Sequence, residues 1–306
     1  MMKNTLKTSS LCFFGLVFLT PGLWAGELDI NLGRGPVTVQ IPTSYNASVP
    51  MPLVLSLHGY TGTGAGHEAY FQMAPVAETR GFLYAYPDGT SDPVGQFWNA
   101  TDACCNFIGS SVDDSAYLRD LIVAVSAQLN VDPERVFIMG HSNGGFMSYR
   151  MACDNADLVA AVASLAGATW NNAANCNPSL PVRVLQIHGT NDDVILYDGG
   201  TIVATYPSAV ETVEQWAVFN GCSLNPQIFS EELDLDSSIS GAESTRTLYA
   251  EGCAAGSSVE LWTIPEGSHS PPLTDDFRQG VIDFFLGTVF NDGFESGDLS
   301  NWSGTG

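Results

Sequence analysis

Ser142 lies in the segment Gly140-His141-Ser142-Asn143-Gly144, which has the form Gly-x-Ser-x-Gly. An apolar run, Val136–Met139, precedes the segment, and a helical pattern follows it. This context is typical of a nucleophile elbow, in which the serine takes a strained backbone conformation and its neighbours must be small. The spacing therefore predicts that Ser142 is a nucleophile, with an ordinary turn between strand and helix as the alternative.

A serine hydroxyl is a poor nucleophile unless a histidine accepts its proton and a carboxylate orients that histidine. In chains that carry the elbow, the acid and then the histidine follow the serine. Only His188 and His269 follow Ser142 here. His269 lies in a loop between the last strand pattern and the last helical pattern and is the expected base, with a surface loop histidine as the alternative. His188 ends a strand and is expected to pack.

The acid is expected in the turn after His188, where Asp192 and Asp193 are adjacent. We favour Asp192 because it comes first in the turn, which leaves Asp193 as a solvated loop carboxylate. Asp198 is a more distant third candidate. The sequence thus predicts a catalytic set that combines Asp192 with the serine and the histidine named above.

Acyl transfer also needs N–H donors for the developing oxyanion. One donor is expected from the backbone of Asn143, directly after the nucleophile. The other is expected from the glycine-rich segment 58–64, with Tyr60 favoured and Thr61 as the alternative. This segment lacks the lysine and the spacing of a phosphate-binding loop, and His58 within it is expected to support the loop.

Trp98 and Trp170 are candidates for an aromatic wall beside an acyl or aryl group, although packing in the core is the commoner role of such residues. The sequence contains no Cys-x-x-Cys pair and no His-rich cluster. Because zinc sites are commonly built from such clusters, we expect no metal ion, and the chemistry described needs no other cofactor.

Short apolar runs alternate with helical patterns from about residue 50 onward. Strands are expected over 52–57, 82–86, 135–139, 159–165, 182–187 and 259–264. Helices are expected over 65–80, 112–129, 143–155, 207–219 and 277–286, and irregular chain over 90–111 and 222–257. This alternation indicates an α/β fold with a mostly parallel sheet that is covered by helices on both faces.

The two ends of the chain differ from its middle. Residues 1–25 have the form of a secretory signal peptide, with Lys3 and Lys7 before an apolar run that is too short to span a bilayer. The alternative for this segment is an uncleaved membrane anchor. We expect residues 26–290 to form one catalytic domain and residues 291–306 an acidic, glycine-rich tail, either disordered or used for sorting or surface retention.

Six cysteines remain once the signal segment is removed, and an even number in a secreted chain indicates up to three disulfides. Adjacent Cys104 and Cys105 are expected not to bond to each other, because the closed loop would be strained. Cys222 and Cys253 flank one insertion and are the favoured pair. The six candidates are Cys104, Cys105, Cys153, Cys176, Cys222 and Cys253.

The mature chain would carry eight arginines, no lysine and 33 carboxylates, which gives a net charge of −25. Such a surface repels nucleic acid and anionic membranes, since both need basic contacts. We therefore expect a secreted, extracellular monomer whose partner is its substrate, and neither a nucleic-acid nor a membrane partner.

An ordered series of short motifs runs through roughly residues 30–289. The motifs are Leu57-His58-Gly59, Tyr86-Pro87-Asp88-Gly89, Trp98 before Cys104-Cys105, Val112-Asp113-Asp114, Val131–Val136, Gly140–Gly145, His188–Asp192, Asn220-Gly221-Cys222, Tyr249–Cys253 and Gly267-Ser268-His269. Together they resemble the secreted polyhydroxybutyrate depolymerase-like esterases, a group that includes single-domain feruloyl esterases. The ordered series is far more specific than any one motif.

The resemblance implies an α/β-hydrolase fold with a triad of Ser142, Asp192 and His269. It also implies esters carried on polymers, either feruloyl or acetyl esters of xylan or polyhydroxyalkanoate. Two departures matter. The loop Glu266–Pro271 differs from the Gly-Gly-His run of many relatives, and the substrate-binding domain of depolymerases that act on solid polyester is absent. The first departure is expected to alter the acyl pocket, and the second favours soluble or oligomeric esters as substrates, feruloylated xylan fragments among them.

Two other functions remain as alternatives. A serine peptidase can use the same triad on the same fold, although the sequence shows no propeller or large cap to select peptides. A non-catalytic binding protein held at the cell surface by its tail is the second, and a complete set of triad residues argues against it. The sequence leaves open the acyl group and the alcohol of the substrate.

Overall fold

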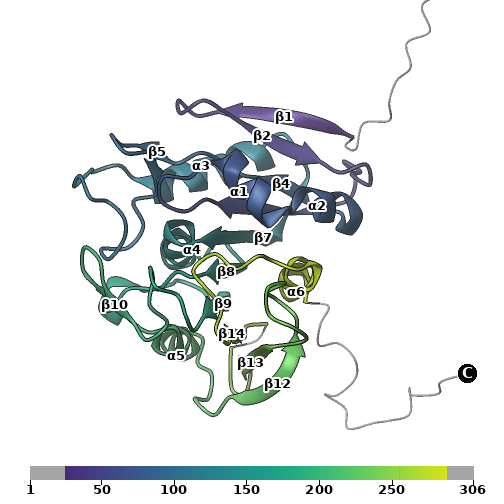
Figure 1. The fold of residues 1–306 in the computed structure, drawn as a ribbon. Helices are drawn as coiled ribbons and strands as arrows, with labels where there is room; N and C mark the ends of the chain where they lie inside the picture. The colour runs from purple at the N-terminus through teal and green to yellow at the C-terminus, as the bar shows by residue number, and fades with distance from the viewer. Residues whose placement is uncertain (1–24, 255, 288–306) are drawn as a thin grey trace, which may run out of the picture.

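The structure is a computed structural model that describes residues 25–254 and 256–287. Residues 1–24 of the expected signal peptide, and the whole of the expected tail, lie outside the described residues. The described chain forms a ten-stranded sheet in the order β1-β2-β4-β3-β7-β8-β9-β14-β13-β12 (Figure 1). Its strands are β1 (Gly26–Asn31), β2 (Pro36–Ile41), β3 (Met51–Leu57), β4 (Leu83–Ala85), β7 (Val131–His141), β8 (Ala161–Leu165), β9 (Arg183–Gly189), β12 (Gln227–Leu233), β13 (Ser244–Tyr249) and β14 (Val259–Ile264).

The middle of this sheet is parallel. Strands β4, β3, β7, β8, β9 and β14 all run in one direction, and antiparallel strands extend the sheet at both edges. Every residue of β8 is buried, as are six of the seven residues of β3 and of β9. Continuous apolar strands of this kind need cover on both faces. The parallel direction also brings the carboxyl ends of these strands to one edge, where ligand sites of such sheets are found.

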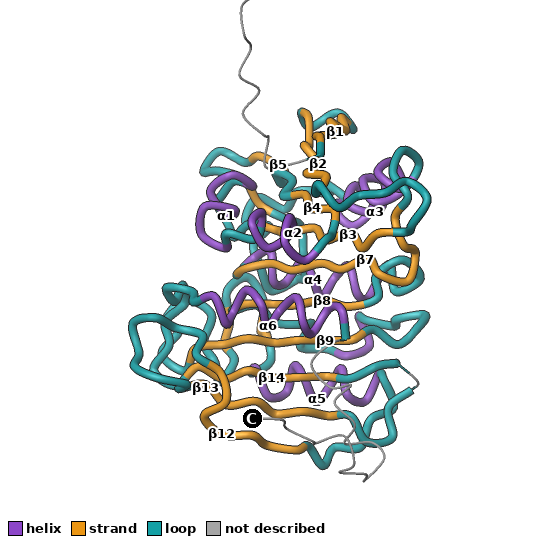
Figure 2. The backbone as a smooth tube through the Cα atoms, turned by 90° about the vertical axis from the view of Figure 1, so that its right-hand side faces the viewer, coloured by secondary structure: helices purple, strands orange, loops and turns teal. Residues whose placement is uncertain are grey.

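Helices cover both faces of the sheet (Figures 1 and 2). Three of them, α3 (Asp114–Ser126), α4 (Asn143–Asp154) and α5 (Ala209–Phe219), pack into one apolar core. The helices α1 (Gly64–Phe71), α2 (Ala74–Arg80) and α6 (Asp275–Leu286) pack into a second core on the opposite face. The α/β-hydrolase architecture expected from the sequence is therefore confirmed.

The expected helix over residues 65–80 is in fact two helices, so this prediction was wrong. Gln72 ends α1 in the left-handed region, with φ of 54°. Pro75 lies in the first turn of α2. Proline is well placed there because that turn needs no N–H donor, but the same residue cannot continue a helix that started earlier.

Two stretches expected to be irregular contain strands. Residues 222–257 form β12 and β13, which pair antiparallel and extend the sheet beyond β14. These strands carry many polar residues because β12 is an edge strand and β13 buries only alternate positions along part of its length. Neither therefore produces an apolar run. Within 90–111, the short strands β5 (Thr90–Ser91) and β6 (Gln96–Phe97) form a hairpin.

All six candidate cysteines form disulfides. The favoured pair Cys222–Cys253 is confirmed. Cys153 bonds to Cys176, which links α4 to the loop after β8. The expectation for Cys104 and Cys105 was wrong, because these neighbours bond to each other across a cis peptide. Since the other four cysteines within the described residues pair among themselves, each of these two is the only partner left for the other in that part of the chain.

None of the helices within residues 25–254 and 256–287 is long and apolar enough to cross a membrane. In the same part of the chain, no three His, Cys, Asp or Glu side chains gather as metal ligands would.

Candidate active site

Ser142 stands at the junction of β7 and α4 with φ of 55°, a value that is uncommon for any residue other than glycine. Its N–H donates to the carbonyl oxygen of Leu165 at 2.8 Å, which anchors the turn to β8. The neighbouring glycines are required by space. A Cβ atom on Gly140 would lie 2.3 Å from the backbone of Gly144, and one on Gly144 would lie 2.0 Å from the carbonyl oxygen of Leu57. The Gly-x-Ser-x-Gly pattern thus has the steric role that the sequence suggested.

Asp192 and His269 meet at the same edge of the sheet although they lie far apart in the chain. Asp192 follows β9, and His269 lies in the loop between β14 and α6. The Nδ1 atom of His269 is 2.7 Å from Oδ2 of Asp192. Asp192 is buried, whereas Asp193 and Asp198 are exposed. The structure therefore pairs His269 with the favoured carboxylate and with neither alternative.

The Asp192 carboxylate accepts hydrogen bonds on both oxygens. Its Oδ1 accepts from the backbone N–H groups of Val194 at 2.9 Å and of Ile195 at 2.8 Å. Burial by itself would raise the pKa of this carboxyl, but hydrogen bonds from His188 and His269 outweigh burial and hold the pKa below its usual range. The group is consequently ionised at neutral pH.

His141 connects the elbow to the loop that carries His269. Its Nε2–H donates to the carbonyl oxygen of His269 at 2.8 Å, and the two rings lie 4.8 Å apart. Burial, followed by repulsion from His269, lowers the pKa of His141 to about 4. The ring is therefore uncharged at neutral pH, and it holds the His269 loop against the strand end next to Ser142.

The segment 58–64 lies beside Ser142, since a Cβ atom on Gly59 would be 3.4 Å from Cβ of Ser142. The N–H of Thr61, the alternative oxyanion donor, is directed elsewhere, because it donates to the carbonyl oxygen of Gln96 at 2.7 Å. This leaves the backbone of Tyr60 as the better placed candidate in the loop.

Asn143 is the first residue of α4, so that its backbone N–H has no acceptor within the helix. Its side chain is fully buried and holds the backbone of Trp98: Oδ1 accepts from N–H at 2.7 Å, and Nδ2 donates to the carbonyl oxygen at 2.9 Å. These two hydrogen bonds between the Asn143 side-chain amide and the Trp98 backbone orient the start of α4, which is the position expected for an oxyanion donor.

The aromatic-wall prediction was wrong for Trp98. This side chain is 0% exposed, and its Nε1–H donates to the carbonyl oxygen of His58 at 3.1 Å. It packs below the site instead of lining it. Trp170 follows β8 and is also part of the apolar core, although 9% of it stays exposed.

His58 supports the loop, as expected. Its Nδ1–H donates to the carbonyl oxygen of Gly59 at 2.8 Å, and its Nε2 accepts from the N–H of Gly89 at 2.9 Å. Burial lowers the pKa of His58, which keeps the ring neutral for this pair of contacts.

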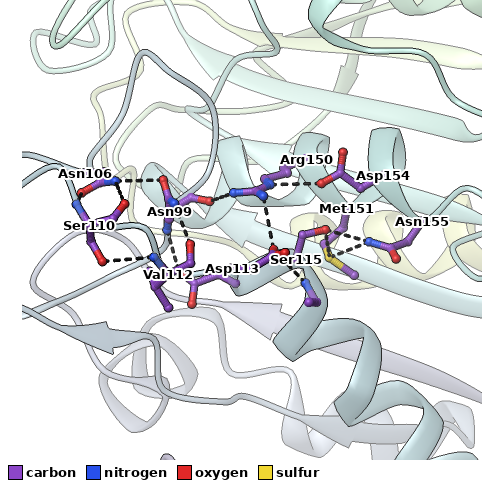
Figure 3. Close-up of polar contacts among 12 residues, drawn as sticks. Asn99, Asn106, Ser110, Val112, Asp113, Ser115, Arg150, Met151, Asp154 and Asn155 are labelled. Carbon is purple, nitrogen blue, oxygen red and sulfur yellow. Dashed lines mark hydrogen bonds and ion pairs between the residues drawn. The ribbon is translucent and has the colours of Figure 1, made fainter.

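A polar network holds the loop between β6 and α3 on helix α4 (Figure 3). Arg150 of α4 donates to the carbonyl oxygen of Asn99 and pairs with Asp113 at 3.3 Å and Asp154 at 3.1 Å. The Asn99 amide in turn donates to the carbonyl oxygen of Val112 at 2.7 Å. Because α4 begins at the elbow, this network fixes the loop relative to the site. The sequence analysis did not single out Arg150.

His188 was expected only to pack, and this expectation was incomplete. The ring is 1% exposed, but its Nε2 lies 3.2 Å from Oδ2 of Asp192, the same oxygen that contacts His269. The one signal in the sequence was a pair of polar residues, Gln186 and His188, two positions apart in a strand that is otherwise buried and mostly apolar.

Fold and site together define an α/β-hydrolase with a serine at the elbow and a histidine–carboxylate pair beside it. The family model described as Esterase PHB depolymerase matches residues 39–247. The chain therefore belongs to this esterase family, and its class of activity is carboxylic ester hydrolysis.

Named relatives and a solved structure agree with this assignment. The chain is 29% identical over 243 residues to Feruloyl esterase B of Piromyces equi. This alignment covers 76% of the chain and 42% of that protein. It is 27% identical over 298 residues to Feruloyl esterase D of Neurospora crassa. That alignment covers 87% of the chain and 91% of the relative. The structure of an acetyl xylan esterase from Aspergillus awamori superposes with a TM-score of 0.61 at 17% identity, covering 85% and 99% of the two chains, and supports the fold.

Proposed function

We propose that the protein is a secreted serine esterase that acts through an acyl-enzyme formed on Ser142. The observation that carries this proposal is the hydrogen bond of 2.7 Å between Nδ1 of His269 and Asp192, in a loop held against the elbow. Because the carboxylate accepts a hydrogen bond from Nδ1–H, the ring proton stays on Nδ1 and the other ring nitrogen, Nε2, is left as a base. That arrangement supplies what a serine nucleophile needs.

In the proposed reaction, Nε2 of His269 takes the proton of the Ser142 hydroxyl as the oxygen attacks the ester carbonyl. The ionised Asp192 stabilises the imidazolium that forms. The backbone N–H groups of Tyr60 and Asn143 stabilise the oxyanion. His269 then returns the proton to the departing alcohol, and a water molecule cleaves the acyl-enzyme by the same route.

For the substrate we propose esters carried on polymers, with feruloyl groups on soluble xylan fragments ahead of acetyl groups and polyhydroxyalkanoate oligomers. The named feruloyl esterases support this order. So does an apolar rim on the loop after β6 and on the segment between β9 and α5. The two are joined by a hydrogen bond of 3.0 Å from the N–H of Val203 to the carbonyl oxygen of Ala103. The large side chains of the rim are each 46–55% exposed, and they are Phe107, Ile108, Val194, Leu196 and Val203.

The rim adjoins the proposed oxyanion loop, since the rings of Tyr60 and Phe107 meet edge to face with centroids 5.0 Å apart. An aromatic acyl group would find apolar contacts there without entering the core. Secretion is proposed from the form of residues 1–25, and the three disulfides support it because such bonds persist in oxidising compartments.

The test compares the purified protein with Ser142→Ala on four substrates: p-nitrophenyl acetate, methyl ferulate, a polyhydroxybutyrate film and a peptide amide. We expect turnover of both small esters, with methyl ferulate preferred over the film, and loss of ester turnover in Ser142→Ala. Full ester activity in the variant would refute the serine mechanism. Cleavage of the peptide amide without ester turnover would favour a peptidase, and preference for the film would replace the feruloyl proposal with a polyester substrate.

A further inference from the structure

A series of buried hydrogen bonds leads from Tyr149 to Asp192. Which atom of each pair is the donor follows from the backbone carbonyl oxygens in the series, because a carbonyl oxygen can only accept a hydrogen bond. Gln186 of β9 lies with Nε2 2.7 Å from the carbonyl oxygen of Gly167. A carbonyl oxygen cannot donate, so the atom that faces it must be the amide nitrogen. The amide oxygen of Gln186 then accepts from the hydroxyl of Tyr149 at 2.7 Å.

This orientation of Gln186 determines the tautomer of His188, two residues further along the same face of the strand. The second proton of the amide nitrogen points to Nδ1 of His188 at 3.0 Å, so Nδ1 accepts and carries no proton. The ring proton is on Nε2, which faces the carbonyl oxygen of Ile195 at 2.8 Å. That oxygen can only accept, so the contacts of both ring nitrogens indicate the same tautomer, with the proton on Nε2.

The Nε2 atom of His188 is also 3.2 Å from Oδ2 of Asp192, so its one proton is shared between this oxygen and the closer carbonyl oxygen of Ile195. Oδ2 therefore faces the shared N–H of His188 and the N–H of His269, while Oδ1 accepts from two backbone N–H groups. A carboxylate offers about four acceptor positions, and each faces an N–H group here. With no exposed surface on the Asp192 side chain, the carboxylate has one orientation in which each of its oxygens faces two N–H groups.

We propose that His188 is a positioning residue for the reaction: it holds the Asp192 carboxylate in the orientation that presents Oδ2 to His269. The inference rests on the proposed function, since it needs the Asp192–His269 pair to be catalytic. His188 does not touch substrate. It also ties the turn after β9 to the strand through the Ile195 carbonyl, so loss of its N–H releases both the carboxylate and the backbone that carries it.

The first experiment compares His188→Leu with His188→Gln on p-nitrophenyl acetate, with rates expressed per active site counted by an irreversible organophosphate. A misplaced catalytic group costs about 10²-fold, and we expect a loss of kcat of that order for His188→Leu with little change in KM. The glutamine side chain brings an N–H near the position of Nε2, and His188→Gln should recover most of the lost kcat. Equal kcat per site in His188→Leu and the parent would overturn the proposal.

A double-mutant cycle separates positioning from general loss of structure. If His188 acts through the carboxylate, His188→Leu should cost no further activity in an Asp192→Ala background. Additive losses would refute the proposal. His67→Leu is the matched control, because His67 is a buried histidine that hydrogen-bonds to Ser56 at 2.8 Å and packs against Phe71 in the core on the opposite face of the sheet. It should lower the melting temperature and leave kcat per active site unchanged.

The two proposals fail in different ways. If Ser142→Ala keeps full activity, the serine mechanism falls and the role of His188 falls with it. If Ser142→Ala is inactive and the cycle is additive, only the role of His188 is lost.

Discussion

Asp192→Asn is the substitution for which the structure makes the sharpest statement. Two backbone N–H groups point at Oδ1, so the new amide must keep its oxygen there. Its nitrogen then takes the place of Oδ2, which lies 2.7 Å from Nδ1 of His269. Two N–H donors cannot face each other, so the ring has to move its proton to Nε2. In that tautomer His269 cannot accept the proton of Ser142.

The cost follows from the same geometry. In serine proteases the equivalent exchange leaves the fold intact and lowers kcat about 10⁴-fold, because the histidine takes the wrong tautomer. Such a loss corresponds to about 5 kcal/mol of transition-state stabilisation. We expect a loss of this order here, with KM for p-nitrophenyl acetate nearly unchanged, since neither tautomer alters the surface that the substrate contacts.

Asp193→Asn is the matched control, because it makes the same chemical change on the adjacent, exposed residue. Initial rates and melting temperatures of both variants and the parent form the assay. Asp193→Asn should behave as the parent does. The reasoning would be refuted if Asp192→Asn kept a tenth or more of the parental kcat, or if Asp193→Asn lost as much as Asp192→Asn.

Three further predictions concern stability. Burial lowers the pKa of His141 to about 4, so between pH 6.5 and pH 4 the unfolded chain binds a proton that the folded chain does not. As the pH falls across that window, the free energy of unfolding should decrease by about 3 kcal/mol through this residue. Urea unfolding measured at a series of pH values should show a weaker dependence of this free energy on pH in His141→Gln. The same pH dependence in the variant and the parent would contradict the prediction. Replacing Cys222 and Cys253 by alanine opens a loop with a sequence separation of 31, which should lower the free energy of unfolding by about 4 kcal/mol; an unmoved urea midpoint would count against it. Arg34→Met leaves the fully buried Asp114 without its cation and should cost about 3 kcal/mol, measured in the same way, with a loss below about 1 kcal/mol as the contrary result.

Local signals accounted for most of the fold. The parallel strands and the helices after residue 50 were visible as apolar runs that alternate with helical patterns, since these strands are buried on both faces and each helix buries one apolar face. The two antiparallel strands after residue 222 were not, because β12 is an edge strand that shows solvent its polar side chains and β13 buries only alternate positions along part of its length, so that neither leaves an apolar run. The break at Gln72 leaves no mark in the hydrophobic pattern, because the left-handed residue is not a glycine; the signal in the sequence was Pro75, which cannot continue a helix that started earlier.

The sequence by itself determined the elbow at Ser142, because its steric demands are met by residues within two positions of the serine. It also narrowed the predicted base to His269, since only two histidines follow the serine. Only the tertiary structure decided that Asp192 faces this histidine while Asp193 faces solvent, that Trp98 packs below the site, and that His188 contacts the same carboxylate. Those outcomes depend on which side chains from distant strands and loops share one buried space, and spacing along the chain does not contain that information.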